Sequence, residues 1–393
     1  MRWGKVKVGD CCEVTSSKRI FFSEYVDSGV PFYRSKEIIE SSNGQAISEP
    51  LFISQEKYDE IKNHFGVPQP GDMLLTSVGT IGVPYIVREK DYFYFKDGNL
   101  TWFRNFSDEL DSKYLYFWVN SSEGQSVLNN TTIGSSQKAL TIASLKGLEI
   151  PCPPAPVQKR IVEILAGYDD LIENNQKQIK LLEEAAQRLY KEWFVDLHFP
   201  GHETTPIVDG VPEGWRRERL VDLVDVQYGY AFDGSLFNTA KNGMPIIRIR
   251  NIPSGNTDDY TTEEADSRYI VHNGDILVGM DGEFHINSWS GPDAYLVQRT
   301  CSFRPNNSEM KGYLLQAIYE PIKYFENTVV GATVAHLGKK HIDTINVLTC
   351  PTNLYVPLQD YYEQRQLLLN QNWLLAEARD RLLPKLMNGE LEV

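Results

Sequence analysis

The chain has 393 residues, of which 41% are hydrophobic and 23% charged. That length exceeds one ordinary hydrophobic core and the composition is that of a globular protein, so we expect two or more domains and exclude a disordered or fibrous chain. The formal net charge is −14, from 53 acidic and 39 basic side chains. Composition alone therefore argues against a generic nucleic-acid binder, which would be basic.

The sequence shows no sign of a membrane segment or of a disulfide framework. No apolar run approaches the roughly 18 residues of a membrane-spanning helix. The start, Met1 to Lys5, is not a signal peptide. The five cysteines are odd in number and lack the paired spacing of a metal site. We therefore expect a reduced, cytoplasmic protein that binds no membrane and no metal.

Residues 1–156 predict a first mixed α/β domain. A helix is expected at 112–120, where apolar residues recur at helical spacing. Short apolar runs beside turn residues predict strands, and these lie at 31–33, 73–77, 83–88 and 92–95.

Residues 157–197 predict one very long helix. A proline cluster from Pro151 to Pro156 suits the approach to a helix but not its interior. From Gln158 to Trp193 a helix would be roughly 54 Å long, at about 1.5 Å per residue, which indicates a spacer or a dimerisation element. Apolar residues alternate there in steps of four and three, which is the heptad seam of a coiled coil: Ile161, Leu165, Tyr168, Ile172, Ile179, Leu182, Ala186, Leu189 and Trp193.

Asn175 fills the one remaining position of this seam. An amide there either fixes the register and orientation of the partner helix, at a cost in stability, or lies at a solvated position. The pattern does not separate these two alternatives.

The second half repeats this plan. Residues 198–211 are rich in Pro, Gly, Thr and acids and predict a linker, and residues 212–357 predict a second mixed domain. A second long helix is expected at 358–393, with Pro384 and Gly389 at its end. Its seam residues lie seven apart, at Tyr361, Leu368, Leu375 and Leu382.

Four stretches recur in the same order in the two halves. A Gly-x-Pro turn, two apolar residues and an arginine occur at 29–34 and again at 243–248. The chain is therefore expected to consist of two homologous halves with loops of different length. The other three matches pair 70–75 with 273–278, 134–140 with 331–337, and 184–189 with 377–382.

No catalytic constellation is found. There is no Gly-x-Gly-x-x-Gly cofactor loop, and 331–340 fails the spacing of a phosphate-binding loop. His202 and Glu203 are followed by no second histidine at helical spacing. Pro153-Pro154-Ala155 lacks the polar residue and the aromatic ring of an amino-methyltransferase loop. We therefore expect a chain that is not itself an enzyme.

Polar, glycine-punctuated loops with basic and aromatic residues are the remaining candidates for function. Arg, Lys, Gln and Asn carry the donors that read base edges in the major groove. Any one such loop is more often an ordinary solvated turn, so only the recurrence of the set in both halves indicates binding. The candidate DNA-binding residues are Lys18, Arg19, Arg34, Lys36, Ser77, Thr80, Ser136, Gln137 and Lys138 in the first half, and Gln227, Tyr228, Tyr230, Arg248, Arg250, His285, Arg299, His336, Lys339 and Lys340 in the second.

Four further stretches are distinctive: the Pro153-Pro154-x-x-x-Gln158-x-x-Ile161 approach to the first long helix, the Gly-Thr-Ile-Gly loop at 79–82, Val211 to Trp215, and Arg381 to Leu391. In these stretches the chain resembles the specificity subunit of a type I restriction–modification system, and the resemblance covers nearly its whole length. The second long helix departs from the pattern, because 360–364 shows no clear copy of the Pro-Pro approach. Trp3 also lacks the Pro-Glu-Gly that precedes Trp215.

The resemblance implies an α+β fold in which two pseudo-repeated mixed α/β target-recognition domains are separated by two long antiparallel coiled-coil helices. Each domain would read one half of a split sequence in double-stranded DNA. The resemblance implies DNA methyltransferase subunits, two of them, as partners, and leaves open whether motor-nuclease subunits join. S-adenosylmethionine and ATP with magnesium would then be bound by the partners, which would also supply much of the phosphate contact that this acidic chain lacks.

Two packed helices bury their seam but leave flanking apolar residues in need of cover, and there we expect the methyltransferase to dock. The residues concerned are Ile164, Leu171, Leu181 and Tyr190. One alternative is a specificity-like subunit that serves only a methyltransferase or a fused restriction variant. Another is a two-headed scaffold that binds protein or glycan. A salt titration separates DNA binding from the scaffold, because phosphate binding weakens steeply with salt.

Overall fold

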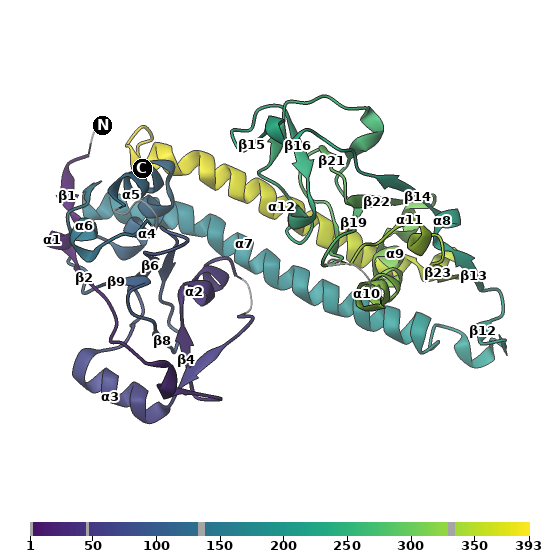
Figure 1. Ribbon diagram of the computed structural model, residues 1–393, viewed down its shortest axis with the longest axis horizontal. Coiled ribbons are helices and arrows are strands. Elements are labelled where there is room, and N and C mark those ends of the chain that lie inside the picture. Colours follow the sequence, from purple (N-terminus) through teal and green to yellow (C-terminus); the bar gives the residue numbers. More distant parts are fainter. Residues whose placement is uncertain (1–2, 45–46, 133–137, 329–334) are drawn as a thin grey trace. The chain divides into compact units, whose positions relative to one another are not determined.

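The computed structural model describes residues 3–44, 47–132, 138–328 and 335–393. The chain forms two compact units, one of Met1–Glu173 with Leu375–Val393 and one of Asn174–Leu374. Each unit contains a β-rich domain and a part of each of two long helices, α7 (Ala155–Tyr190) and α12 (Val356–Met387), as Figure 1 shows. The predicted α+β class, with two mixed domains and two long packed helices, is confirmed.

In the described residues of the first unit there are two four-stranded sheets and a short ribbon. One sheet is antiparallel, in the order β2 (Glu13–Thr15), β9 (Leu100–Arg104), β6 (Met73–Thr76) and β7 (Pro84–Ile86). The other has the order β3 (Tyr25–Val26), β5 (Leu51–Ile53), β4 (Val30–Tyr33) and β8 (Tyr94–Phe95), with β4 and β8 parallel. The ribbon pairs β1 (Lys5–Lys7) with β10 (Glu149–Pro151).

The helices of the first unit begin and end where the sequence chemistry dictates. The helix predicted at 112–120 is α4 (Ser112–Asn120), and the Asp111 carboxylate caps it by accepting from the amides of Lys113 and Tyr114. Ser121 ends α4 and caps the next helix in turn. The other helices are α1 (Val8–Cys11), α2 (Ser35–Ser42), α3 (Gln55–Phe65), α5 (Ser122–Thr131) and α6 (Ile142–Lys146).

The second unit repeats this arrangement. Its four-stranded sheet has the order β14 (Val224–Tyr228), β22 (Thr300–Pro305), β19 (Ile276–Gly279) and β20 (Ile286–Ser288). Its five-stranded sheet has the order β15 (Phe237–Asn238), β17 (Tyr260–Thr261), β16 (Met244–Ile247), β21 (Ala294–Leu296) and β18 (Ile270–Val271). Two ribbons pair β11 (Ile207–Val208) with β12 (Val211–Pro212) and β13 (Arg216–Arg219) with β23 (Asn346–Thr349).

Within the described part of the second unit, four shorter helices complete the fold, and one of them needs a glycine to approach α12. A Cβ at Gly312 would lie 2.1 Å from the carbonyl oxygen of Leu358, so only glycine allows this close approach. The helices are α8 (Leu220–Leu223), α9 (Lys311–Ala317), α10 (Tyr319–Thr328) and α11 (Lys339–Ile342).

Hydrogen bonds confirm the predicted internal repeat. The amide of Gly71 donates to the carbonyl of Val87 (2.9 Å), and the amide of Gly274 donates to that of Trp289 (2.8 Å). The parallel pair β4 and β8 recurs as β16 and β21. The two halves therefore share one backbone design.

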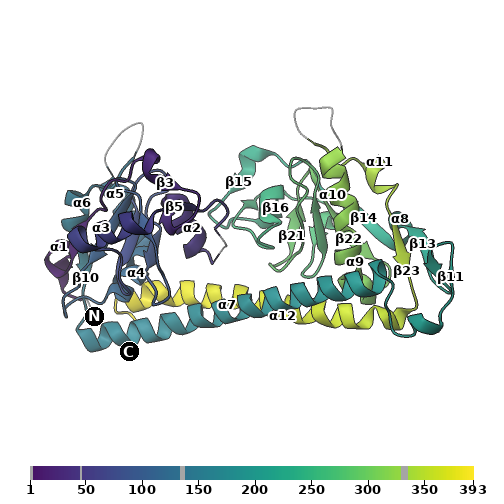
Figure 2. The same cartoon turned by 90° about the horizontal axis from the view of Figure 1, so that it is seen from below.

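The long helices lie side by side and antiparallel within each unit, as Figures 1 and 2 show. Asp169 pairs with Arg379 (2.6 Å) in the first unit, and Glu183 pairs with Arg365 (2.6 Å) in the second. The step forward from Asp169 to Glu183 along α7 equals the step back from Arg379 to Arg365 along α12. The same register therefore holds in both units. Asn175 is buried, and its amide faces the Gln371 side-chain oxygen at 3.4 Å, which favours the register role.

The start of α12 resolves the register that the sequence left open. The Gln158 side-chain oxygen accepts from the amide of Asp111 (2.9 Å), and that of Gln359 accepts from the amide of Gly312 (3.1 Å). In both cases a glutamine in the first turn of a long helix accepts a hydrogen bond from the start of a domain helix, α4 in the first unit and α9 in the second. Pro357 and Gln359 are therefore the counterparts of Pro156 and Gln158. The second copy of the approach to a long helix thus begins before residues 360–364, where the sequence showed none.

The prediction that Pro384 ends the second long helix is wrong. Pro384 lies inside α12, which continues to Met387. A proline in the last turn removes only one helical hydrogen bond, so it is tolerated there. Gly389, with φ 74°, provides the left-handed turn after the helix, as predicted. The first long helix was predicted over 157–197, with its seam ending at Trp193. In the structure α7 stops at Tyr190, three residues before that last seam position, and a π turn over Lys191–Val195 follows.

A buried polar network fastens the second domain to α12. The Arg365 guanidinium donates to the Ser288 hydroxyl and to the Asn287 side-chain oxygen, each at 2.7 Å, besides its pair with Glu183. Gln366 donates to the carbonyl of Trp289 at 2.6 Å and accepts from the Ser288 hydroxyl at 2.8 Å. Arg365 and Gln366 are both buried. The network fixes where β20 sits on the helix.

Replacing Arg365 tests this fastening. We expect Arg365→Met to lower the free energy of unfolding by about 3 kcal/mol, because it leaves buried acceptors without their donor. Urea denaturation measures the change. Arg381→Met is the control, since Arg381 is exposed and its ion pair is with Glu377, one turn away on the same helix. Equal effects of the two changes would contradict a structural role for the network.

Candidate nucleic-acid interface

Backbone hydrogen bonds bring predicted loops of the second unit together at one end of the sheet β14-β22-β19-β20. The amide of Met280 donates to the carbonyl of Arg299 (2.9 Å), and the amide of Leu337 donates to the carbonyl of Met280 (2.7 Å). Tyr230, just beyond β14, donates its amide to the end of β21 (2.9 Å). Loops far apart in the sequence therefore share one edge of the domain.

The first unit uses the same bonds. The amide of Ser77 donates to the carbonyl of Asn99 (2.8 Å), and the amide of Leu140 donates to the carbonyl of Ser77 (2.9 Å). Lys138 and Thr80 are exposed on these loops. Two candidate residues, Ser136 and Gln137, lie outside the described residues.

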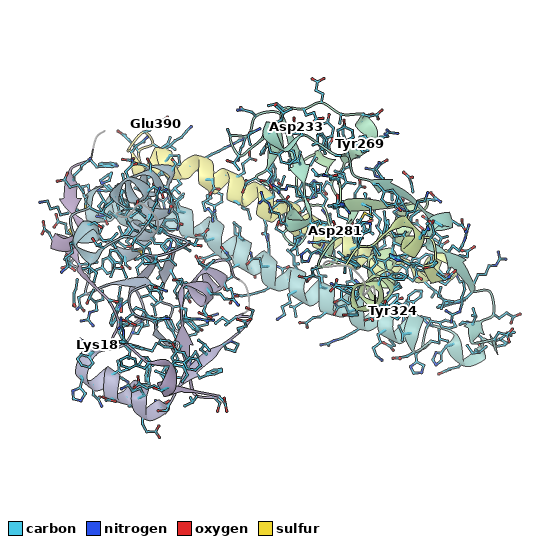
Figure 3. The ribbon with its side chains drawn as sticks, in the orientation of Figure 1. Lys18, Asp233, Tyr269, Asp281, Tyr324 and Glu390 are labelled. Carbon is cyan, nitrogen blue, oxygen red and sulfur yellow. The ribbon has the colours of Figure 1, made fainter. Side chains whose placement is uncertain are left out.

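Asp281, labelled in Figure 3, contacts two predicted residues at this edge of the second unit. Its Oδ1 lies 2.5 Å from Nδ1 of His336, and its Oδ2 lies 3.4 Å from Nε of Arg299. The same His336 nitrogen is 3.4 Å from Nη1 of Arg299. One nitrogen cannot both donate to the carboxylate and accept from the guanidinium, and the shorter separation favours donation to Asp281. Asp281 is not in the predicted set, because a lone aspartate in a turn carries no sequence signal of binding.

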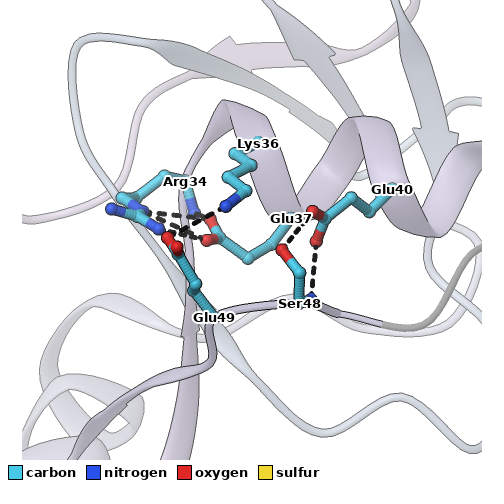
Figure 4. A network of polar contacts seen from close by, with 6 residues as sticks. All are labelled: Arg34, Lys36, Glu37, Glu40, Ser48 and Glu49. Carbon is cyan, nitrogen blue, oxygen red and sulfur yellow. Dashed lines mark hydrogen bonds and ion pairs between the residues drawn. The ribbon is translucent and has the colours of Figure 1, made fainter. Parts of the chain in front are cut away.

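Arg34 is held by an internal acid. Figure 4 shows its guanidinium against Glu37, with Nη2 2.5 Å and Nε 3.1 Å from Oε1, and the Arg34 amide donates to Oε2 at 2.6 Å. Burial raises the pKa of Glu37, but the hydrogen bonds from Arg34 outweigh it and hold that pKa below its usual value. Beside them, Lys36 pairs with Glu49 at 2.9 Å on the surface. Nε and Nη2 of Arg34 are therefore committed to the fold.

The equivalent turn of the second unit is built with an amide instead of a carboxylate. The Arg248 amide donates to the Asn251 side-chain oxygen (2.9 Å), which leaves the Arg248 guanidinium to lie over the Phe237 ring at 5.6 Å. Arg250 pairs with the buried Asp259 at 2.5 Å and 3.1 Å. Burial raises the pKa of Asp259, and the bonds from Arg250 and Asn251 lower it below its usual value.

The basic pair of the first domain is exposed but has neighbours. The Lys18 ammonium lies 4.4 Å over the Phe65 ring, and Arg19 pairs with Asp97 at 2.9 Å. Lys339 and Lys340, at the start of α11, are exposed. His285 lies 3.5 Å from the Glu283 carboxylate.

Three predicted residues serve packing. Ser77 is buried, and its hydroxyl bonds with that of Thr101 at 2.7 Å. The Gln227 side chain donates to the carbonyl of Tyr228 at 2.7 Å. Burial raises the pKa of Tyr228 to about 12. These three side chains are therefore engaged in hydrogen bonds or packing within their own domain.

The flank of the long helices exposes leucines. Leu171 is 52% and Leu181 is 64% exposed, whereas Ile164 packs partly buried on the core of the first unit. Tyr190 also packs on its own unit, stacked on Phe194 with ring centroids 5.5 Å apart. On α12, Leu367 (57%) and Leu374 (56%) are equally exposed, although only their seam neighbours were predicted.

In the second unit, two of these leucines border a shallow depression of about 310 Å³. Gln178, Leu181 and Leu182 of α7 line it, opposite Gln364, Leu367 and Leu368 of α12. Leu367 and Leu374 lie seven residues apart. This second heptad series, next to the seam, is the sequence pattern from which they could have been predicted.

Among the described residues, no three His, Cys, Asp or Glu side chains are grouped as metal ligands, and the five cysteines are free. No helix of the described ranges is both long and apolar enough to cross a membrane.

Comparison with known proteins decides the family. The family model described as "Type I restriction modification DNA specificity domain" matches residues 1–184 and 212–353. The chain belongs to this family. It is 26% identical to the type I restriction enzyme MjaIX specificity subunit of Methanocaldococcus jannaschii, over 100% of this chain and 94% of that one. It is 29% identical to the EcoBI specificity subunit of Escherichia coli over 44% of this chain and 33% of that one.

A solved structure supports the same fold. The type I restriction–modification S subunit from M. genitalium superposes with a TM-score of 0.57 at 15% identity, over 98% of this chain and 96% of that one. The chain is thus a type I DNA specificity subunit with target-recognition domains and long helices. The sheet-edge loops described above belong to those domains.

The Arg34–Glu37 pair of this specificity subunit gives a pH-dependent stability. Because the folded pKa of Glu37 lies below its ordinary 4.5, the ionised carboxylate stabilises the fold above about pH 4.5. That contribution disappears as the pH falls through the folded pKa. We expect Glu37→Gln to lose about 2 kcal/mol at neutral pH and to flatten the decline of stability between about pH 5 and pH 3.

Denaturant melts at several pH values measure this effect. Glu49→Gln is the matched control from the same network, because Glu49 is 73% exposed and its pair with Lys36 is open to solvent. An unchanged pH profile in Glu37→Gln would show that the carboxylate does not stabilise the folded state.

Proposed function

We propose that this specificity subunit binds a split target in double-stranded DNA and directs methyltransferase and restriction subunits to it. One observation carries the proposal. Both domains build the same sheet-edge loops from main-chain bonds, through Ser77 and Asn99 in one and Met280 and Arg299 in the other. The exposed side chains on these shared loops differ. A pair of identical scaffolds with unlike surfaces suits the reading of two different half-sequences.

The domain boundaries and the site residues remain part of this proposal. The first recognition module is taken as 1–156 and the second as 212–357, with long spacer helices at 157–197 and 358–393 and a linker at 198–211. Lys18, Lys138, Lys339 and Lys340 are exposed on or beside the sheet-edge loops, which suits phosphate contact. Four other predicted residues are weaker candidates for DNA contact, because their side chains are engaged within the domains: Arg34, Ser77, Gln227 and Tyr228.

The chemistry is proposed to lie on the partners. Methyltransferase subunits would bring S-adenosylmethionine, and motor-nuclease subunits would bring ATP and magnesium. Because the chain carries a net charge of −14, the partners would also supply part of the phosphate contact. The purified chain alone is then expected to transfer no methyl group.

Exchanging one domain tests the two-module reading. The graft should run from the N-terminus through Cys152, because β10 pairs with β1 and both strands must come from the same parent. We expect a chain with this region from a relative to methylate a motif that is new in its first half and unchanged in its second. Sequencing that detects methylated bases in cells measures the motif. The reciprocal exchange of 212–350 is the matched control, and a change in both halves after either exchange would contradict independent reading.

We further propose that the exposed leucines of the long helices dock the methyltransferase. Leu181 and Leu367 border the depression between α7 and α12, and two aspartates there would place charge in an apolar interface. We expect Leu181→Asp with Leu367→Asp to abolish copurification with the methyltransferase subunit while the circular dichroism melt is unchanged. Lys180→Asp is the control, since its side chain points about 100° away around the helix. Retention of the partner by the double variant would place the docking surface elsewhere.

A further inference from the structure

The edge of the second domain carries a charged trio that its backbone does not require. The trio consists of Asp281, Arg299 and His336. Asp281 and His336 form an isolated antiparallel bridge, and Val78 and Ala139 form the same bridge in the first domain. Asn99 occupies the position of Arg299, since its carbonyl accepts the equivalent amide.

The repeat thus provides an internal comparison for these three positions. The same main-chain framework forms with Val, Ala and Asn in one domain and with Asp, His and Arg in the other. The charged side chains therefore contribute little that the fold needs. A function outside the fold explains why they stand there.

Backbone strain at Arg299 points the same way. Its backbone φ is 71°, in the left-handed region that residues other than glycine rarely adopt. The turn before β9 in the first domain also contains a left-handed residue, but there it is a glycine, Gly98 with φ 77°, directly before Asn99. The first domain thus makes its turn without strain. An arginine in this strained conformation indicates that its side chain has a function that outweighs the cost of the strain.

The guanidinium of Arg299 contacts Asp281 through one nitrogen and keeps other N–H donors available. Its Nε lies 3.4 Å from Asp281 Oδ2, while its side chain is 56% exposed. Within the described residues Nη2 makes no hydrogen bond. Asp281, itself bonded to His336, lies against Nε of the guanidinium. Because Nδ1 of His336 donates to Asp281, it cannot also accept from Nη1, so both terminal nitrogens, Nη1 and Nη2, keep donors for a ligand.

The adjacent carboxylate selects what this fork can bind. A phosphate would be repelled by Asp281, whereas a neutral base edge would not. Two parallel donors match two acceptors on one edge. In the major groove only guanine offers that pair, O6 and N7, because adenine and cytosine present a donor and thymine a single oxygen beside a methyl group.

We propose that Arg299, steadied by Asp281, is the residue that reads a guanine in the half-site bound by the second domain. This proposal rests on the proposed function, that is, on target recognition by both domains. It adds the base and the side chain that selects it. His336 acts through Asp281 as a positioning residue.

The test uses the full chain co-expressed with its methyltransferase subunits and maps methylated motifs in the cell. Arg299→Gly is the decisive variant, because glycine adopts the left-handed conformation of this position without strain. We expect its thermal midpoint to be unchanged or higher, one guanine of the second half-site to become degenerate, and the first half-site to stay as it was. In binding to purified DNA, the preference for guanine over adenine at that position should fall about 10- to 100-fold.

Two further variants separate the causes. Lys241→Gly is the matched control: Lys241 also has a positive φ, 60°, in an exposed turn of the second unit, away from the trio. It should keep the whole motif. Arg299→Lys keeps the charge but loses the fork, so it should lose the guanine preference, with the salt dependence of binding unchanged.

The outcomes distinguish the two proposals. If the wild-type complex methylates no two-part motif, the proposed function fails and this assignment fails with it. If the wild-type motif has two parts and Arg299→Gly leaves it intact, or relaxes a position that is not guanine, the assignment alone is overturned. A salt slope lowered by about one in Arg299→Gly would also overturn it, because the lost charge would then have neutralised a phosphate.

Discussion

Each domain depends on buried polar bonds that fasten it to a long helix. In the first unit Gln158, almost fully buried, donates to the carbonyls of Glu109 (2.7 Å) and Pro153 (2.8 Å) and accepts from the amide of Asp111 (2.9 Å). In the second, Arg365 and Gln366 fix β20 on α12. An apolar contact between a helix and a domain tolerates sliding, whereas a buried amide or guanidinium loses all its partners if it moves. The loops at the sheet edge inherit their placement within each unit from these few bonds.

The order of the elements could be predicted from the sequence because the signals are local or periodic. The heptad spacing predicted α7, and Ile161 and Leu165 are fully buried on its seam. The apolar run at 73–77 predicted β6, whose four residues are all buried. The recurrence of short blocks predicted the repeat, and the parallel pair of strands in each domain follows it. Such patterns survive because packing must be satisfied residue by residue.

The candidate site was harder to predict because it depends on which partner each charge finds. Arg34 and Arg299 are both arginines in recurring loops, yet Glu37 binds Nε and the terminal Nη2 of Arg34, while Asp281 contacts only Nε of Arg299. No spacing rule encodes that difference, since Asp281 follows β19, Arg299 precedes β22, and the two meet only through the pairing of these strands. Gln359 escaped notice for a similar reason. Its role shows in the bond to Gly312, not in the Pro-Pro motif that marks Gln158.

The shared bridge at the sheet edge bears on how such chains diversify. Val78 with Ala139, and Asp281 with His336, enter the fold through their main-chain atoms. Substitution at these points carries little folding penalty, so selection can explore side chains there while the framework stays intact. A descendant can acquire a new DNA preference through a handful of nucleotide changes confined to one edge, without first evolving compensating stability elsewhere.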